Sequence, residues 1–208
     1  MIAISGMPGS GKGSFIHFLQ EQGIPVVRMG DMVREELARK GLDPVPGTVG
    51  KLANAMREKQ GPAIWARRTL EAMDNLPNEA WNALKKGGQK DRREHLPIII
   101  DGLRSMAELD LFRSRLPGFF LLSVHCSPKL RWQRMRLRGR SDDFQEEAQF
   151  LQRDQRELNW GIGEVIAMSD EIITNNGNQE ELEEKASCFL ARLMELSTIT
   201  GNDPVEQG

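Results

Sequence analysis

The sequence predicts an α/β fold in which one parallel sheet carries helices on its faces. Short apolar, β-branched runs alternate with longer charged segments of helical period, a pattern typical of buried parallel strands joined by helices. The length of 208 residues is enough for one sizeable core. Five strands are expected, at residues 1–5, 24–27, 97–101, 119–125 and 171–174.

The segments between these strands predict the helices. Residues 31–96 contain helical patterns but no strand, so we expect a helical insertion that binds a substrate, with an exposed polar loop at 85–94. Asn178 and Glu181 have the spacing of a capping box and predict the start of the last helix. The buried face expected for this helix comprises Leu182, Ala186, Phe189, Leu190, Leu193 and Met194.

Composition excludes several classes of protein. Lys and Arg total 28 against 30 for Asp and Glu, and this net charge of −2 gives no electrostatic reason to bind nucleic acid or an anionic membrane. No apolar run approaches the roughly 20 residues that cross a bilayer. The two cysteines, Cys126 and Cys188, are too few for a disulfide framework. We therefore expect a cytoplasmic protein, monomeric or homodimeric, that acts on small molecules.

A phosphate-binding loop is predicted directly after the first strand. Residues 6–14 read Gly-Met-Pro-Gly-Ser-Gly-Lys-Gly-Ser and open an apolar helical segment. A polyphosphate needs converging backbone N–H groups, a helix N-terminus and a mobile cation, which the glycines and Lys12 supply. The residues expected to bind ATP here are Gly6, Pro8, Gly9, Ser10, Gly11, Lys12, Gly13 and Ser14.

Ser14 and Asp101 are the candidate Mg²⁺ residues. The usual pattern places Ser or Thr directly after the lysine, whereas Gly13 intervenes here, so direct coordination and coordination through water both stay open. Asp101 ends the third predicted strand, which is expected beside the loop, where a carboxylate can order the water around Mg²⁺.

Two short motifs indicate an acceptor site. In residues 30–34, Asp31 is expected to cap a helix and to place Arg34 on its first turn, within reach of a phosphate. A capped surface helix with a solvated arginine is the alternative. After the third strand, Asp101 is followed closely by Arg104, which starts the next helix near the same phosphate. Asp31, Arg34, Asp101 and Arg104 are thus the candidate substrate-binding residues.

An arginine-rich segment after the fourth strand predicts a lid. Arg131, Arg134 and Arg138 fall on one helical face, which would carry a stripe of guanidinium groups toward the phosphates. Phosphoryl transfer spreads negative charge in its transition state, and closing arginines stabilise that charge. We expect Arg138 and Arg140 to close over the transferring group; a solvated basic helix is the alternative.

The loop at 6–14 resembles that of adenylate kinase and other nucleoside monophosphate kinases. Residues 30–34 are similar to their Gly-Asp-Met-Leu-Arg motif, 101–104 to Asp-Gly-Phe-Pro-Arg without the proline, and 140–143 to Arg-Lys-Asp-Asp. The resemblance implies a three-layer P-loop NTPase fold with strand order 2-3-1-4-5. It also implies a kinase domain at 1–197.

The same resemblance implies the remaining domain limits and catalytic roles. The acceptor insertion would span 31–96 and the short lid 138–143. The lack of periodicity after Ser197 separately predicts a flexible tail at 198–208. Lys12, Arg138 and Arg140 would act on the transferred phosphoryl group. An arginine on a later helix would also contact the transferred phosphoryl group. Arg153 and Arg156 are the candidates for this role, and Arg153 is favoured.

The segment 169–177 resembles the corresponding part of dephospho-coenzyme A kinase, which implies that the backbone near Asn176 and Gly177 contacts the adenine ring. An Asn-Gly turn that only caps the following helix is the alternative. The predicted function is a nucleotide kinase that transfers the γ-phosphoryl group of Mg·ATP to a nucleoside monophosphate or a related small nucleotide. Two alternatives stay open, a dephospho-coenzyme A kinase-like activity and an ATP-binding regulator without phosphotransfer.

Overall fold

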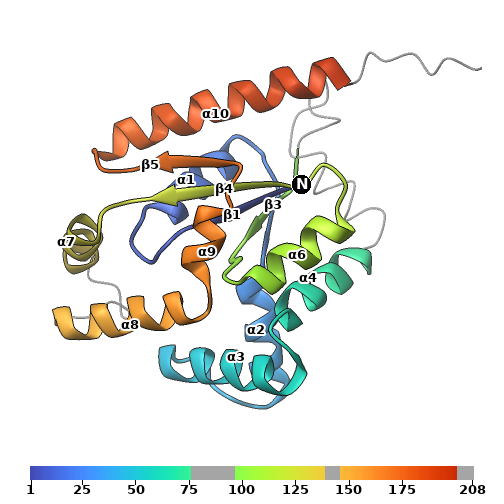
Figure 1. Cartoon of the computed structure of the whole chain (residues 1–208), viewed down its shortest axis with the longest axis vertical. Helices are drawn as coiled ribbons and strands as arrows, with labels where there is room; N and C mark the ends of the chain where they lie inside the picture. Colours follow the sequence, from blue (N-terminus) through green and yellow to red (C-terminus); the bar gives the residue numbers. More distant parts are fainter. Residues whose placement is uncertain (76–96, 139–145, 201–208) are drawn as a thin grey trace, which may run out of the picture.

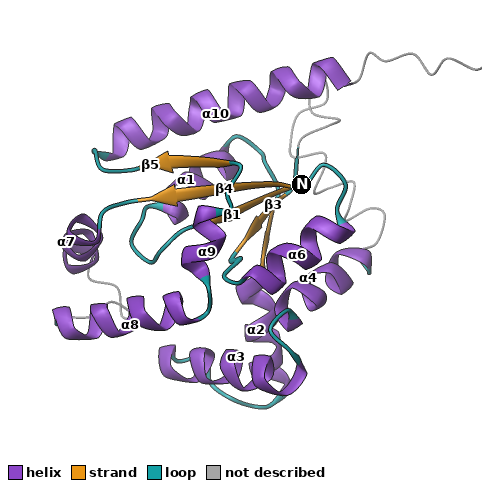
Figure 2. Cartoon of the chain, viewed as in Figure 1, coloured by secondary structure: helices purple, strands orange, loops and turns teal. Residues whose placement is uncertain are grey.

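The computed structural model describes residues 1–75, 97–138 and 146–200. Its centre is a five-stranded parallel sheet in the order β2-β3-β1-β4-β5, which confirms the predicted fold and strand order (Figures 1 and 2). The strands are β1 Ile2–Ser5, β2 Val26–Arg28, β3 Ile99–Asp101, β4 Phe120–His125 and β5 Glu171–Thr174.

Helices cover both faces of this sheet. They are α1 Lys12–Glu21, α2 Met29–Arg39, α3 Pro46–Gln60, α4 Ile64–Asp74, α6 Met106–Arg115, α7 Pro128–Arg138, α8 Glu147–Asn159, α9 Ile162–Ala167 and α10 Gln179–Thr200. Figure 1 shows α10 along one side of the sheet and α6 and α9 along the other. None of the described helices is long and apolar enough to cross a membrane.

The alternation of side chains along β1 builds two separate cores. Ile2 and Ile4 pack with Phe15 of α1 and Phe189 of α10 on one face. Ala3 points to the opposite face. There it joins a second cluster that contains Met29, Trp65, Leu109, Phe112 and Val165 from α2, α4, α6 and α9. Because successive residues of a strand face opposite sides, a nearly continuous apolar strand is what a three-layer fold requires.

The helices α2, α3 and α4 occupy part of the insertion expected between the second and third strands. Trp65 ties α4 to α3, because its indole nitrogen donates a hydrogen bond to the carbonyl oxygen of Ala53 at 3.2 Å. The side chain of Trp65 is 1% exposed, so this pairing lies inside the second core. The polar loop expected at 85–94 lies outside the described residues.

The helix expected to be capped by Asp31 begins earlier than predicted. α2 starts at Met29 with Arg28 at its N-cap, so Asp31 lies within the first turn and not at the cap. Met29 is buried in the core and Gly102 packs against its Cβ, which holds the start of the helix directly after β2. A carboxylate within the first turn still interacts favourably with the helix dipole.

The predicted start of the last helix is confirmed, because α10 begins at Gln179, directly after Asn178. The backbone N–H of Glu181 donates to Oδ1 of Asn178 at 2.9 Å. Leu182, Ala186 and Phe189 are buried, whereas Met194 is 38% exposed, so the buried face ends before Met194. α10 continues to Thr200, three residues into the expected tail, and 201–208 lie outside the described residues.

Candidate active site

The loop between β1 and α1 has a backbone that only glycine suits. Gly9 and Gly11 have φ angles of 80° and 93°, in the left-handed region that other residues avoid. A Cβ atom at Gly11 would overlap the side-chain amide of Asn175, and one at Gly9 would press on the backbone of Arg131. The glycines therefore allow both α7 and the end of β5 to approach the loop closely.

Two side chains hold the carbonyl groups of this loop. Asn175, which follows β5, donates from Nδ2 to the carbonyl oxygen of Ser10 at 2.8 Å. Arg131 of α7 donates from Nη1 to the carbonyl oxygen of Pro8 at 3.0 Å. The first N–H groups of α1 have no acceptor within the helix, and Lys12, Gly13 and Ser14 line the cavity at this end. The loop thus has its carbonyl groups bonded to protein and N–H groups at a cavity, the arrangement that binds phosphate.

Lys12 forms an ion pair with Asp101, so the residues expected to bind ATP and Mg²⁺ lie together. Asp101 ends β3, where it lies beside Ile4 of β1, and the side chains of the pair are 22% and 20% exposed. An incoming polyphosphate would compete with Asp101 for the ammonium group. Asp101 itself does not line the cavity, although Lys12 does.

A cavity of about 500 Å³ opens over the loop and collects residues from five parts of the chain. A volume of this size suits a small-molecule ligand. The expected site residues that line it are Gly6, Pro8, Gly9, Ser10, Gly11, Lys12, Gly13, Ser14, Arg104, Arg138 and Arg153. Arg140 and the rest of the expected lid beyond Arg138 lie outside the described residues.

The expected arginine stripe on α7 is corrected by the structure. Arg131 is only 3% exposed and forms a buried ion pair with Asp154 of α8. Arg134 lines the cavity but donates to the carbonyl oxygens of Asn175, at 2.9 Å, and Gly177, at 2.5 Å. The shared helical face was predicted correctly, but it packs on the phosphate-binding loop and on the turn before α10. A buried guanidinium needs such partners, so Arg131 is a structural residue.

The motif at 30–34 does not reach the cavity. Arg34 is paired with Asp31 on the same helix at 2.5 Å, and their side chains are 60% and 49% exposed. Neither residue lines the cavity, and this geometry matches the alternative of a solvated surface arginine. Because α2 starts at Met29, Arg34 lies on the second turn of the helix and not on the first turn, where it was expected.

The turn that follows β5 lies at the cavity, as expected, but Asn176 itself is not among the lining residues. Asn175 and Gly177 line the cavity, whereas Asn176 does not. The Oδ1 atom of Asn176 accepts a hydrogen bond from the backbone N–H of Ser127 at 3.1 Å. The segment is therefore at the site through Asn175 and Gly177, while the Asn176 side chain faces Ser127.

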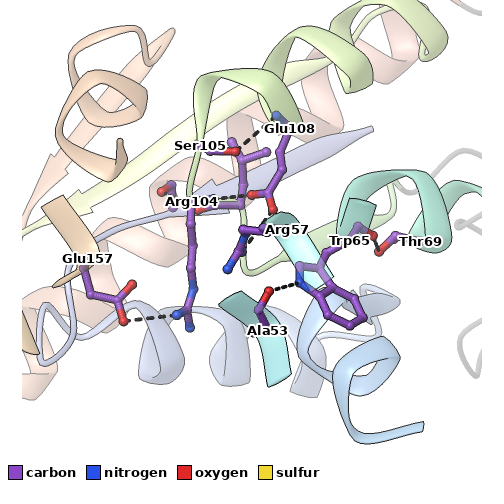
Figure 3. Close-up of polar contacts among 10 residues, drawn as sticks. Ala53, Arg57, Trp65, Thr69, Arg104, Ser105, Glu108 and Glu157 are labelled. Atoms are coloured by element: carbon purple, nitrogen blue, oxygen red, sulfur yellow. Dashed lines mark hydrogen bonds and ion pairs between the residues drawn. The ribbon is translucent and has the colours of Figure 1, made fainter. Parts of the chain in front are cut away.

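Glu157 is a site residue that sequence reasoning missed. It is 2% exposed, lines the cavity and accepts a hydrogen bond from Nη1 of Arg104 at 3.0 Å (Figure 3). Its position four residues after Arg153 places both on one face of α8, and this helical spacing is the signal that could have identified it. The buried carboxylate fixes the direction of the Arg104 side chain.

Cys126 contacts Arg134 at the edge of the site, in an environment that disfavours the thiolate. Burial raises the pKa of its thiol, and the nearby Arg134 and Arg131 guanidinium groups only partly oppose this rise. The thiol accepts a hydrogen bond from Arg134 at 3.3 Å. A nucleophilic cysteine requires the thiolate, so the environment of Cys126 disfavours covalent chemistry.

The donor set fits Mg²⁺ that arrives with a nucleotide. Within 1–75, 97–138 and 146–200, no cluster of three or more His, Cys, Asp or Glu side chains could hold a metal ion. Mg²⁺ commonly uses one or two protein oxygen ligands, with phosphates and water as the rest. The Asp101 carboxylate and the Ser14 hydroxyl, both next to the phosphate-binding loop, supply this kind of ligand.

Comparison with known proteins identifies the family. A family model described as "AAA domain" matches residues 2–156. A UPF0200 protein of Methanothermobacter thermautotrophicus is 35% identical over 208 residues, covering 100% of this chain and 98% of the relative. A UPF0200 protein of Hyperthermus butylicus is 36% identical over 193 residues, covering 93% and 94%.

A solved structure agrees at the level of the fold. The shikimate kinase of Bacteroides thetaiotaomicron superposes with a TM-score of 0.53 at 16% identity, covering 93% of this chain and 97% of that enzyme. At this identity the likeness concerns the fold alone. The chain has a P-loop, kinase-like fold, and its residues 2–156 match the AAA domain model. It therefore belongs to the UPF0200 family.

Proposed function

We propose that the protein is a phosphotransferase that moves the γ-phosphoryl group of Mg·ATP to a nucleoside monophosphate or a related small nucleotide. One observation carries this proposal: cationic side chains from four separate elements line a single cavity over the phosphate-binding loop. They are Lys12 of α1, Arg104 before α6, Arg134 and Arg138 of α7, and Arg153 of α8. A cavity with this charge suits two phosphate-bearing ligands better than one neutral molecule.

The donor half of the site follows from the loop. Lys12 and the N–H groups at the start of α1 would bind the β- and γ-phosphates. Asp101 and Ser14 would hold Mg²⁺, directly or through water, and the bound ion would neutralise charge on the phosphates. The turn at Asn175 and Gly177 would border the adenine, because both residues line the same cavity.

The transfer step needs positioning and positive charge more than acid–base chemistry. An acceptor oxygen attacks the γ-phosphorus, and ADP leaves with the electrons of the broken P–O bond. Arg138 and Arg153 come from the two helices on either side of 139–145, and both line the cavity. They would therefore stabilise the negative charge on the phosphoryl group during its transfer. The role of Arg140 stays a prediction.

A dephospho-coenzyme A kinase-like activity is the second candidate. One observation favours it: the segment with that resemblance contributes to the cavity, and Asn175 contacts the phosphate-binding loop. The acceptor in that case would be the hydroxyl group of a larger nucleotide.

Product analysis tests the proposal directly. The protein is incubated with Mg²⁺ and γ-labelled ATP in the presence of AMP, CMP, GMP, UMP or dephospho-coenzyme A, and the products are separated by chromatography. A labelled nucleoside diphosphate supports the proposal, and label on dephospho-coenzyme A alone supports the second candidate. ATP binding without any labelled product would overturn both and identify an ATP-binding regulator.

A further inference from the structure

Three arginines gather around one tryptophan beside the cavity. The guanidinium carbons of Arg57, Arg104 and Arg156 lie 5.0, 5.3 and 5.4 Å from the ring centre of Trp160. The arginines come from α3, the segment before α6, and α8, so three parts of the fold meet here. The ring attracts cations through its π-electrons, which partly offsets the repulsion among the three positive charges.

Two buried carboxylates hold two of these arginines, Arg57 and Arg104, in place. Glu108, 0% exposed, accepts from Nη2 of Arg57 at 3.1 Å and from the backbone N–H of Arg104 at 2.9 Å. Glu157 accepts from the side chain of Arg104 at 3.0 Å. Figure 3 shows Arg57 and Arg104 between these two carboxylates. Three arginines against two glutamates leave one positive charge in excess, at a place where Arg57 is mostly buried while Arg104 is 39% exposed and Arg156 is exposed on α8.

Arg57 also has unused hydrogen-bonding capacity. Its side chain is 14% exposed, and its Nε and Nη1 atoms are buried without a hydrogen-bond partner among the described residues. Buried donors that lack an acceptor are costly, and an arginine with donors to spare is suited to bind an oxyanion. Arg34, in contrast, is exposed and paired with Asp31 on its own helix.

We propose that Arg57 and Arg104, supported by Trp160, bind the phosphate monoester group of the acceptor. This inference rests on the proposed phosphotransfer and assigns to Arg57 the role that the sequence motif assigned to Arg34. Arg57 and Trp160 do not line the cavity over the phosphate-binding loop themselves. Arg104 connects the two regions, because it lines that cavity and also contacts Trp160. Trp160 is a positioning residue: guanidinium groups surround its ring, so the ring supports the arginines and does not stack on a base.

Binding measured without ATP tests the site separately from the transfer. Isothermal titration calorimetry is carried out with AMP, CMP, ribose 5-phosphate, adenosine, cytidine and shikimate as probes. At least one phosphate monoester should bind, and its affinity should exceed that of the matching compound without phosphate by about tenfold or more. Binding of ribose 5-phosphate as tight as that of AMP and CMP would assign the site to a sugar phosphate instead of a nucleotide.

Three variants locate the contact. Arg57→Met should weaken binding of the phosphate monoester about tenfold or more, and Arg57→Lys should restore part of the loss, because lysine keeps the charge but lacks the planar fork. Arg67→Met on α4 is the matched control; this exposed arginine has the same charge and should leave binding unchanged. Affinity for Mg·ATP should stay the same in all three, which separates loss of the contact from general misfolding.

Several results would overturn the inference. If Arg57→Met binds the phosphate monoester as tightly as the wild type does, Arg57 is not part of the site. If shikimate binds more tightly than every phosphate monoester, the site binds a carboxylate and not a phosphate. If no phosphate monoester binds while Mg·ATP does, the acceptor assignment fails and the nucleotide-binding half of the proposed function survives. If Mg·ATP does not bind either, the proposed function itself fails.

Discussion

Arg131 of α7 and Asp154 of α8 form a buried bidentate ion pair, in which Nη1 donates to Oδ1 at 2.8 Å and Nη2 donates to Oδ2. The same guanidinium donates to the carbonyl oxygen of Pro8 in the phosphate-binding loop at 3.0 Å. Residues 139–145 lie in sequence between these two helices. The pair therefore connects both helices that flank the expected lid to the loop that would hold the phosphates.

Removing one partner of this pair should destabilise the protein strongly. Asp154→Asn leaves the Arg131 guanidinium buried without a counter-charge, so we expect the free energy of unfolding in urea to fall by about 3 kcal/mol. The control is Arg192→Gln, which breaks the more exposed pair between Arg192 and Glu171 and should cost at most about 1 kcal/mol. Equal losses in the two variants would contradict the structural role of Arg131.

Neighbouring asparagines should differ in their effect on nucleotide binding. Asn175→Ala removes the hydrogen bond to the Ser10 carbonyl group, and we expect about tenfold weaker binding of Mg·ATP. Asn176→Ala is the matched control, because its side chain contacts Ser127 instead of the loop. A larger loss of affinity in Asn176→Ala than in Asn175→Ala would reverse this assignment.

Thiol modification should distinguish the two cysteines. Burial raises the pKa of Cys126, so its thiolate is scarce at neutral pH, whereas Cys188 is exposed on α10. Iodoacetamide at pH 7.5 should label Cys188 first, with Cys126 modified only after unfolding, as measured by mass spectrometry of peptides. Labelling of both at one rate in the native protein would show that Cys126 is accessible.

Glu36 should contribute stability that depends on pH. Its side chain accepts a hydrogen bond from Arg68 at 2.8 Å, which lowers the pKa of Glu36 below its ordinary value of 4.5; Arg39 and Lys40 add to this. The native state then binds fewer protons than the unfolded state. The stabilisation is therefore full above pH 4.5 and is lost as the pH falls through the lowered value.

Urea denaturation measures this effect. Glu36→Gln should reduce the free energy of unfolding at pH 7, and the difference from the wild type should shrink steadily below pH 4.5. Glu71→Gln on α4 is the control, since the exposed Glu71 forms no ion pair within the described part of the chain. A difference for Glu36→Gln that is constant from pH 7 to pH 3 would show that the ion pairs do not cause it.

The parts of the fold that local patterns control could be predicted from sequence. The five strands, their order and the phosphate-binding loop followed from apolar runs, from glycine spacing and from the family resemblance. The start of α2 could not be predicted in this way. It depends on Met29, which is buried against Gly102, a residue far away in the sequence. Helical spacing placed Arg131 on the correct face, but no pattern shows which element that face will meet.

Contacts between distant residues account for the other differences. Asn175 reaches the loop because its backbone N–H bonds to the carbonyl oxygen of His125 at 2.7 Å, which extends the pairing of β5 and decides which asparagine faces the cavity. Arg57 and Trp160 are about one hundred positions apart in the chain, and neither belongs to a recognisable motif. Only the three-dimensional fold brings them together.

The most direct test of the central claim is the binding of Mg·ATP to the wild type and to Lys12→Ala, measured by isothermal titration calorimetry. We predict saturable binding by the wild type and at least about tenfold weaker binding by the variant. In the same samples, turnover with the acceptor found by product analysis should fall about 100-fold or more in Lys12→Ala. Failure of the wild type to bind any adenine or guanine nucleotide in the presence of Mg²⁺ would contradict the account.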